Sequence, residues 1–364
     1  MHWKFSEEQD AYRETLRGWL GDVAGSDQVR AWLGLDPAGP GRPAADPTEF
    51  EDRWVADGLC GVGFPEELGG QGGGVVELAI TAEELARVAA PSAAWLATTL
   101  AMPALETRPD LAKAALEGSH AAVAIAAESL PAAPGHVTAD ADGALTGVVP
   151  RVLGADRAGL LVVPAGGASG PRLYAVDTAQ PGVEITPRRL LDRSRSVADV
   201  RLSGVVGQPL DVDAATVLSA TTDLAGVLLG ADALGAMERM LELAVDYSAQ
   251  RQQFGVPIGS FQAVKHAAAT ILVDVEAGRS GLYYAAASVA ERHAESSLHS
   301  AAVKAQVTAA AGRAADSALT MHGAIGYTWE HDLHLFFKRA RLDEQLFGSV
   351  EDWNERISSG LTLA

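Results

Sequence analysis

The C-terminal part of the chain carries long helical periodicity, and this feature most limits how the chain can fold. From Ala214 onward apolar residues recur at steps of three and four, for example at Leu224, Val227, Leu228, Ala231 and Leu234. Further helical patterns cover 262–292, 297–320 and 333–347. Because long helices with short connections pack as antiparallel bundles, we expect a C-terminal four-helix bundle.

The rest of the chain divides into a helical part and a strand-rich part. Helical patterns occupy most of residues 6–115. Short apolar or alternating runs follow between 121 and 202, punctuated by Gly, Pro and Asp, and they indicate a small antiparallel β-barrel-like domain. The sequence therefore predicts an α+β protein with three domains: 1–118 (helical), 119–212 (β-domain) and 213–364 (helical bundle).

Charge and composition exclude several classes of partner. The formal net charge is −19, which disfavours nucleic acid and anionic membrane surfaces. A single cysteine, Cys60, leaves no internal disulfide and fits a reducing compartment. Residues 1–5 lack the apolar run of a signal peptide, and no apolar stretch has membrane character. We expect a cytoplasmic protein without membrane insertion.

Four motifs occur in order along the chain. Gly58–Gly72 is a loop dense in Gly that contains Pro-Glu, and Asp192-x-x-Arg195 follows late in the expected β-domain. Arg251–Gln262 has the pattern Arg-x-x-Phe-Gly-x-x-Ile-x-x-x-Gln, and His322–Glu330 begins His-Gly-Ala-Ile-Gly-Tyr. Together these segments resemble the acyl-CoA dehydrogenase family, and the resemblance covers nearly the whole chain.

The resemblance implies a flavoprotein that binds FAD, takes an acyl-CoA substrate and passes electrons to an electron-transfer acceptor. A bidentate guanidinium such as that of Arg251 suits a pyrophosphate, and an aromatic ring can pack on the adenine. In the family the loop around Gly323 comes from a neighbouring subunit, so FAD binding implies an oligomer. The FAD contacts implied are Arg251, Gln253, Phe254, Gln262, His322, Gly323 and Gly326.

Two simpler readings compete with these assignments. Arg251 could be a helix-end residue that forms an ion pair with an acidic neighbour such as Asp246. His322, His331 and His334 could suggest a metal, but no carboxylate–histidine spacing here resembles a closed site, and we expect no metal.

The sequence departs from the family where the catalytic base is expected. The base is usually a Glu in the loop before the last helix, a position that counts to Gly348 here. In a minority it lies near the start of the first bundle helix, a position that counts to Ala225, and Gly226 replaces the Arg that usually follows. No catalytic residue is therefore identified. Displaced candidates are Asp223, Glu351 and Asp352.

The flavin-ring cradle of the family is also reduced. Of its Thr-Glu-Pro and Ala-Gly-Ser-Asp segments, the stretch Ala126–Pro131 keeps only Glu128. Thr320 stands where a Gln usually precedes the His-Gly loop. The chain thus carries the adenine and pyrophosphate contacts without the base or the cradle.

This combination resembles the base-lacking subunit of actinobacterial heterotetrameric (α2β2) acyl-CoA dehydrogenases, which act on bulky substrates such as steroid side-chain thioesters. A paralogous dehydrogenase subunit would then supply the base. Three alternatives stay open at this point: a homo-oligomeric dehydrogenase with a displaced base, base-free flavin chemistry such as desulfination or monooxygenation, and a scaffold subunit without flavin.

Overall fold

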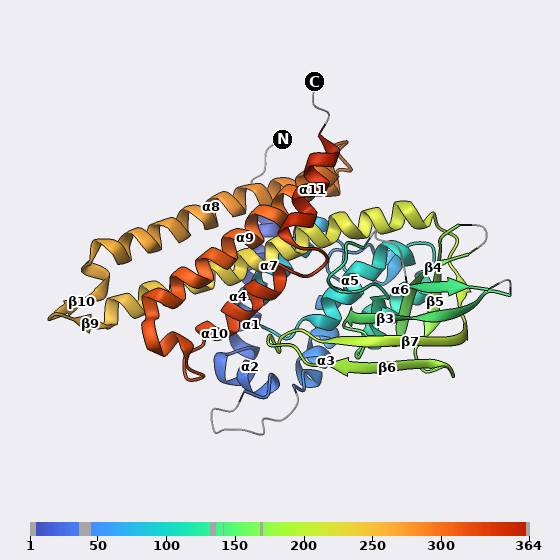
Figure 1. Ribbon diagram of the computed structural model, residues 1–364, viewed down its shortest axis with the longest axis horizontal. Coiled ribbons are helices and arrows are strands. Elements are labelled where there is room, and N and C mark those ends of the chain that lie inside the picture. The colour runs from blue at the N-terminus through green and yellow to red at the C-terminus, as the bar shows by residue number, and fades with distance from the viewer. Residues whose placement is uncertain (1–4, 36–44, 132–135, 141, 168–169, 362–364) are drawn as a thin grey trace.

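The computed structural model describes residues 5–35, 45–131, 136–140, 142–167 and 170–361. The predicted absence of a signal peptide concerns residues 1–5, of which 1–4 lie outside the described residues. A β-sheet occupies one end of the molecule, and the long C-terminal helices extend from it toward the other end (Figure 1). The N-terminal helices pack against both. This is the α+β architecture expected from the sequence, whereas the exact domain boundaries remain predictions.

The N-terminal part is helical, as expected. Its helices are α1 (Glu7–Val23), α2 (Ser26–Trp32), α3 (Thr48–Ala56), α4 (Val75–Arg87), α5 (Ala93–Leu105) and α6 (Pro109–Ala114). Ser6 begins α1 with a capping box, in which its hydroxyl accepts from the Gln9 amide and the Gln9 side chain accepts from the Ser6 amide. Helices α4 and α5 are almost wholly buried and form the core of this part.

The middle part is a mixed eight-stranded sheet. Its strands are β1 (Ala121–Val123), β2 (Val137–Ala139), β3 (Ala144–Leu153), β4 (Leu160–Gly166), β5 (Arg172–Asp177), β6 (Val183–Arg188), β7 (Val197–Val206) and β8 (Gln208–Pro209). The order is β6-β7-β3-β2-β4-β5-β8, with β1 paired to β4.

The sheet is not purely antiparallel, which corrects one expectation. Strand β4 pairs in parallel with both β1 and β2. Strand β3 pairs antiparallel with β2, and the short connection at 154–159 turns the chain back into β4. Strand β4 therefore runs in the same direction as β2, on whose other side it lies. Alternating hydrophobicity identifies strands but carries no information on the direction of their partners.

The C-terminal part contains α7 (Ala214–Gln250), β9 (Gln252–Gln253), β10 (Val256–Pro257), α8 (Gln262–Ala290), α9 (Ser296–His322), α10 (Leu333–Asp343) and α11 (Val350–Gly360). The expected fourth helix at 333–347 ends at Asp343, and α11 is an additional helix packed on α9. The helical domain is thus confirmed, but among the described residues it has five α-helices where the sequence predicted four. Ser349 caps α11 by accepting from the Asp352 amide.

Helix α7 is long and apolar enough to cross a membrane by length and composition alone. However, 78% of its most apolar window is buried inside the protein. A Cβ atom added at Gly235 would lie 2.1 Å from the Glu83 carbonyl oxygen of α4. Glycine here allows α4 and α7 to approach closely, so α7 is the central core helix of the protein.

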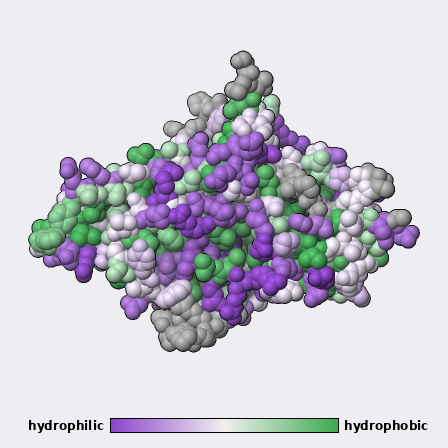
Figure 2. Space-filling model, viewed as in Figure 1, coloured by the Kyte–Doolittle hydropathy of each residue, from purple (hydrophilic) through white to green (hydrophobic). Residues whose placement is uncertain are grey.

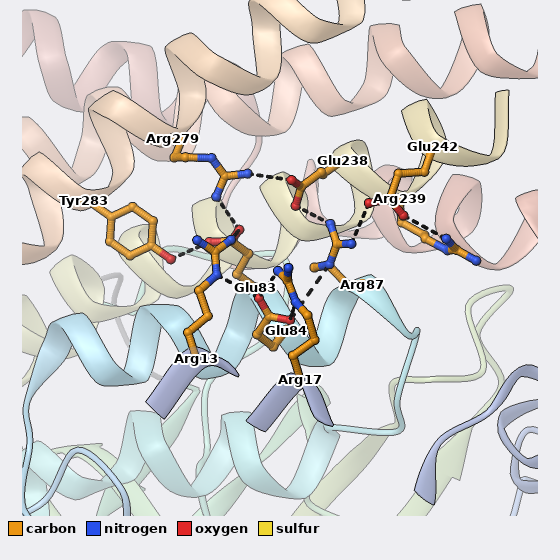
Figure 3. A network of polar contacts seen from close by, with 10 residues as sticks. All are labelled: Arg13, Arg17, Glu83, Glu84, Arg87, Glu238, Arg239, Glu242, Arg279 and Tyr283. Carbon is orange, nitrogen blue, oxygen red and sulfur yellow. Dashed lines mark hydrogen bonds and ion pairs between the residues drawn. The ribbon is translucent and has the colours of Figure 1, made fainter. Parts of the chain in front are cut away.

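A buried cluster of carboxylates and guanidinium groups ties the N-terminal helices to the bundle (Figure 3). Glu83 of α4 is fully buried and accepts from Arg13 of α1 at 2.7 Å, Arg279 of α8 at 2.6 Å and the Tyr283 hydroxyl. Burial and the Glu83 charge raise the pKa of Tyr283. Because each buried charge is paired, removal of one partner would leave a costly buried ion.

Candidate functional site

The segment Arg251–Gln262 forms a tight hairpin between α7 and α8. Arg251 ends α7, and its carbonyl accepts from the Ile258 amide at 2.8 Å, which closes the turn. Strands β9 and β10 pair antiparallel around Phe254 and Gly255, which have φ values of 54° and 80°. The left-handed conformation suits Gly255 and is strained for Phe254.

The side chains of this hairpin point into solvent. Phe254 is 93% exposed, and its only ring partner among the described residues is Phe261, with centroids 6.1 Å apart. Arg251, Gln253 and Gln262 are exposed as well. Among the described residues the Arg251 guanidinium forms no ion pair, so the alternative pairing with Asp246 is not found.

A second expected segment, the loop after α9, begins at a buried histidine. His322 is 3% exposed, and its Nδ1 lies 2.7 Å from the Ala318 carbonyl oxygen. Burial lowers the pKa of His322, so the ring is neutral at pH 7. Gly323 follows with φ 62°, and a Cβ atom added there would meet nothing within 4 Å. Gly326 is instead closely packed, since a Cβ atom would lie 2.9 Å from Leu319 Cδ1.

The fold brings the hairpin and this loop to the same end of one chain. The Tyr247 ring of α7 stacks on His322 with centroids 4.8 Å apart and planes 19° apart. The Tyr247 carbonyl accepts from the Arg251 amide at 2.8 Å, so Arg251 lies one helical turn beyond this stack. Figure 2 shows apolar surface at the tip where Figure 1 places β9 and β10.

These residues fit the adenine and pyrophosphate half of a dinucleotide. An unpaired, exposed guanidinium can bind a pyrophosphate, and an exposed aromatic ring can pack on a base. The open space at Gly323 lets a ligand approach the backbone closely. For His322, His331 and His334, among the described residues no group of three or more His, Cys, Asp or Glu side chains is arranged so that it could hold a metal ion.

The position expected for the base in most of the family is closed by neighbouring side chains. Gly348 has φ 102°, and a Cβ atom added there would lie 3.1 Å from Leu130 Cδ2 and 3.2 Å from Trp353 Nε1. Trp353 is completely buried and donates to the Phe347 carbonyl at 3.0 Å. Ala301 and Ala305 of α9 complete this apolar cluster. A larger side chain at position 348 would meet packed protein.

The second base position is closed too. Ala225 is fully buried in α7. At Gly226, where the family usually has an Arg, a Cβ atom would lie 2.2 Å from Ser300 Oγ and 3.0 Å from the Ser300 carbonyl oxygen. The Ser300 hydroxyl donates to the Asp223 carbonyl at 2.6 Å. Helices α7 and α9 are thus too close at Gly226 to house an arginine.

Two of the three displaced candidates, Asp223 and Asp352, form structural hydrogen bonds, and the third, Glu351, is exposed. The Asp223 carboxylate accepts from Arg356 at 2.9 Å and from Ser297 at 2.5 Å. Asp352 accepts from the Ser349 amide at 2.8 Å in the capping box of α11, and Glu351 is an exposed residue in the same first turn.

The segment that stands in place of the flavin-ring cradle makes contacts within this chain. Glu128 pairs with Arg151 of β3, which has φ 48°. The Ala127 amide donates to the Arg151 carbonyl at 3.0 Å, and the Ala127 carbonyl accepts from the Phe347 amide at 2.5 Å. The loop after β1 is therefore joined directly to the loop before α11.

The expected Asp192-x-x-Arg195 turn belongs to a buried ionic tie. Arg195 pairs with Asp232 of α7, and Arg339 of α10 donates to both Asp232 carboxylate oxygens at 2.6 and 2.7 Å. Burial alone would raise the pKa of Asp232, but the two guanidinium groups lower it. Sequence reasoning missed Asp232 and Arg339. A lone Asp in the apolar run of α7 was the available signal.

Lys304 of α9 was also missed, and it lies beneath the closed position. It is completely buried, and its ammonium group donates to the Asp343 carbonyl at 2.6 Å and the Gly348 carbonyl at 3.4 Å. Burial lowers the pKa of Lys304 to about 8. This lysine satisfies carbonyls at the end of α10 and fixes the loop that contains Gly348.

Comparison with known proteins identifies relatives over nearly the whole chain. Residues 6–108 match the acyl-CoA dehydrogenase N-terminal domain, and residues 216–361 match the C-terminal domain. The chain is 33% identical over 359 residues to the acyl-CoA dehydrogenase IpdE2 of Mycobacterium tuberculosis, with 97% of each chain covered. It is also 33% identical to the acyl-CoA dehydrogenase FadE34 of that organism over 97% of this chain and 48% of FadE34.

Solved structures agree. The ChsE4–ChsE5 complex from Mycobacterium tuberculosis has a TM-score of 0.86 at 26% identity, with both chains fully covered. A variant of the Tcur3481–Tcur3483 steroid ACAD has a TM-score of 0.85 at 27% identity and covers 97% of each chain. Both of these structures are similar to the present chain from end to end.

Proposed function

This chain belongs to the acyl-CoA dehydrogenase family, and on that premise we propose that it is the non-catalytic subunit of a heteromeric, FAD-dependent acyl-CoA dehydrogenase. It supplies contacts to the adenine and pyrophosphate of FAD, while a paralogous subunit supplies the base and the flavin-ring cradle. The complex removes hydrogen from the α- and β-carbons of an acyl-CoA thioester.

A contrast between two sites carries the proposal. At one end of the bundle, Arg251, Phe254 and Gly323 are exposed. The space beside Gly323 contains no other atoms of the described chain within 4 Å of an added Cβ. At the other, the space beside Gly348 is packed with Leu130 and Trp353. A chain that donates half of a cofactor site and lacks the other half accounts for both features.

Within this proposal each exposed residue has a chemical task. Arg251 binds the pyrophosphate through a bidentate, charge-assisted interaction, and Phe254 packs on the adenine. Gln253 and Gln262 hydrogen-bond the ribose or the adenine edge. The backbone at Gly323 approaches the same group from α9. When bound, FAD supplies the acceptor for the hydride, and an electron-transfer acceptor then takes the electrons.

The surface around the hairpin supports a protein partner. Besides Phe254, the apolar side chains of Val256, Phe261, Leu272 and Val273 are between 38% and 67% exposed on the hairpin and the first turns of α8. Exposed apolar residues that gather in one segment mark an interaction surface. A second dehydrogenase-fold chain that brings its own flavin-ring cradle would cover them.

The relatives support a proposal for the substrate class. One similar solved structure is described as a steroid ACAD and another as a complex of two different chains. We propose a bulky acyl-CoA, of the steroid side-chain kind, as the substrate of the complex.

The test is purification of the chain alone and after co-expression with a paralogous dehydrogenase-fold subunit from the same organism. We expect FAD and acyl-CoA oxidation only in the co-purified complex. A monodisperse homotetramer of this chain that retains FAD and oxidises acyl-CoA with an electron acceptor would refute the proposal. Flavin without any oxidation of acyl-CoA by the complex would favour base-free flavin chemistry instead.

A further inference from the structure

An arginine of the N-terminal part holds the loop between α9 and α10. Arg30 of α2 donates to Asp332 Oδ1 at 2.9 Å and to the Trp329 carbonyl. The Ser26 hydroxyl, one helical turn earlier, also bonds to Asp332. The Arg30 side chain is only 12% exposed. The tie joins segments 302 residues apart, and none of the four recognition motifs contains Arg30.

The Asp332 carboxylate bonds to Arg30 and Ser26 of α2 and not to the backbone of α10, the helix that it precedes. It occupies the N-cap position of α10, where an Asp side chain usually accepts from a backbone amide two or three residues on. Here it makes no such hydrogen bond, and its two carboxylate oxygens are directed to α2. The geometry at this end of the loop is therefore set by Arg30 and Ser26.

The loop also has contacts within the C-terminal part. The His331 ring lies 4.5 Å from the His322 ring, and the Trp329 ring lies 4.8 Å from the His334 ring, measured between centroids. The Lys338 ammonium lies 3.8 Å from the centre of the Trp329 ring. Gly323, Ala324, Tyr327, Trp329 and Glu330 are exposed. Inside the loop, the Thr328 hydroxyl donates to the Ile325 carbonyl at 2.8 Å. The start of the loop is fixed by the stack of His322 on Tyr247, and its end by Arg30. A change at Arg30 therefore removes the tie between α2 and the end of the segment that contains Gly323 and Gly326, and leaves that end held only from within the C-terminal part among the described residues.

We propose that Arg30 is a positioning residue for FAD, which acts by fixing the loop Gly323–Gly326 against the hairpin of Arg251. The inference rests on the proposed function, because it assumes that this loop contacts the cofactor. Arg30 itself does not touch the cofactor. Its planar guanidinium bridges a carboxylate and a backbone carbonyl at once, which a lysine ammonium on a flexible stem does less well.

The experiment compares Arg30→Ala, Arg30→Lys, Asp332→Ala and the double variant Arg30→Ala/Asp332→Ala in the flavin-loaded preparation. FAD release is followed by its fluorescence on dilution, and Tm is measured in parallel. We expect Arg30→Ala to weaken FAD binding roughly tenfold, as for loss of a charge-assisted hydrogen bond. Arg30→Lys is expected to weaken it less, and the double variant no more than Arg30→Ala, since the two residues act as one unit.

Arg157→Ala is the matched control. Arg157 pairs with Glu51 of α3 and so ties the N-terminal part to the β-domain, away from the loop. The Arg157→Ala variant is expected to have a lower Tm and an unchanged FAD affinity. Equal FAD affinity in wild type, Arg30→Ala and Arg157→Ala would overturn the inference. If Arg30→Ala does not fold, Arg30→Lys decides: weakened FAD binding supports the inference and unchanged binding overturns it. Absence of FAD from the wild-type preparation would instead refute the proposed function.

Discussion

The two ends of the helical domain differ in what their residues contribute. At the hairpin end, Arg251 and Phe254 are exposed and contribute little to the stability of the isolated chain. At the Gly348 end, Leu130, Trp353 and Lys304 fill and fix the space in which the family places its base. This difference is the one that the proposed function requires, with one end available for binding and the other packed as core.

The largest expected effect is a loss of stability at the Gly348 end that leaves FAD binding at the hairpin end unchanged. Trp353→Ala removes a fully buried indole and should lower the free energy of unfolding by ~3–5 kcal/mol. Chemical denaturation of the complex measures this loss, and FAD affinity of the folded fraction should stay unchanged. If FAD affinity fell as well, the Gly348 end would be part of the cofactor site.

Arg251→Ala should give the opposite result. Because the side chain is exposed and unpaired in the described chain, Tm should change little. Loss of a bidentate contact to pyrophosphate should weaken FAD binding about 10²-fold, on the order of 2.7 kcal/mol. Titration of the apo-complex with FAD measures this. Arg201→Ala, which removes an exposed arginine of the β-domain, serves as the control and should leave FAD binding intact.

A pH series sharpens the same contrast. The pKa of Lys304 is lowered to about 8 in the folded chain, from an ordinary value of 10.5. Between these values the unfolded chain binds more protons, so the Lys304 contribution to the free energy of unfolding rises as pH rises from 8 to 10. Relative to Lys304→Met, wild type should gain roughly 1–3 kcal/mol over this range. A constant difference between the two proteins would show that Lys304 keeps an ordinary pKa.

FAD affinity should follow a different course in that pH series. Lys304 contacts the loop that contains Gly348 and not the hairpin of Arg251, so FAD affinity of the folded complex should not depend on Lys304. A change of FAD affinity that parallels the change of stability would indicate that both ends respond as one unit.

The smallest expected effect is that of Phe254→Ala. Loss of an aromatic contact to the adenine should weaken FAD binding by about 1 kcal/mol, while removal of a 93% exposed side chain leaves Tm unchanged. Phe261→Ala is the neighbouring comparison, and an equal loss of affinity there would show that the hairpin conformation, not the Phe254 ring, carries the effect.

Local patterns predicted the helices well, because a helical face repeats within a few residues. The long periodic run at α7 was read directly from the sequence. The parallel pairs of β4 and the separate helix α11 were not, since strand direction depends on distant partners and the break after Asp343 depends on Lys304 and Gly348 packing.

The candidate site was predictable only in part, for a similar reason. The motif Arg251–Gln262 is contiguous, so its residues could be named in advance, although their roles remain predictions. The closure beside Gly348 depends on Leu130 and Trp353, which lie far apart in sequence and have no local signature. The same holds for Arg30, whose contact spans most of the chain.

The ratio of FAD to polypeptide in the purified, active preparation tests the central claim most directly. Flavin absorbance and quantitative amino-acid analysis give this ratio, and mass spectrometry gives the subunit composition. The account predicts two different dehydrogenase-fold chains in equal amounts, with one FAD for each pair. One FAD for every copy of this chain, in an active assembly that contains no other subunit, would contradict it.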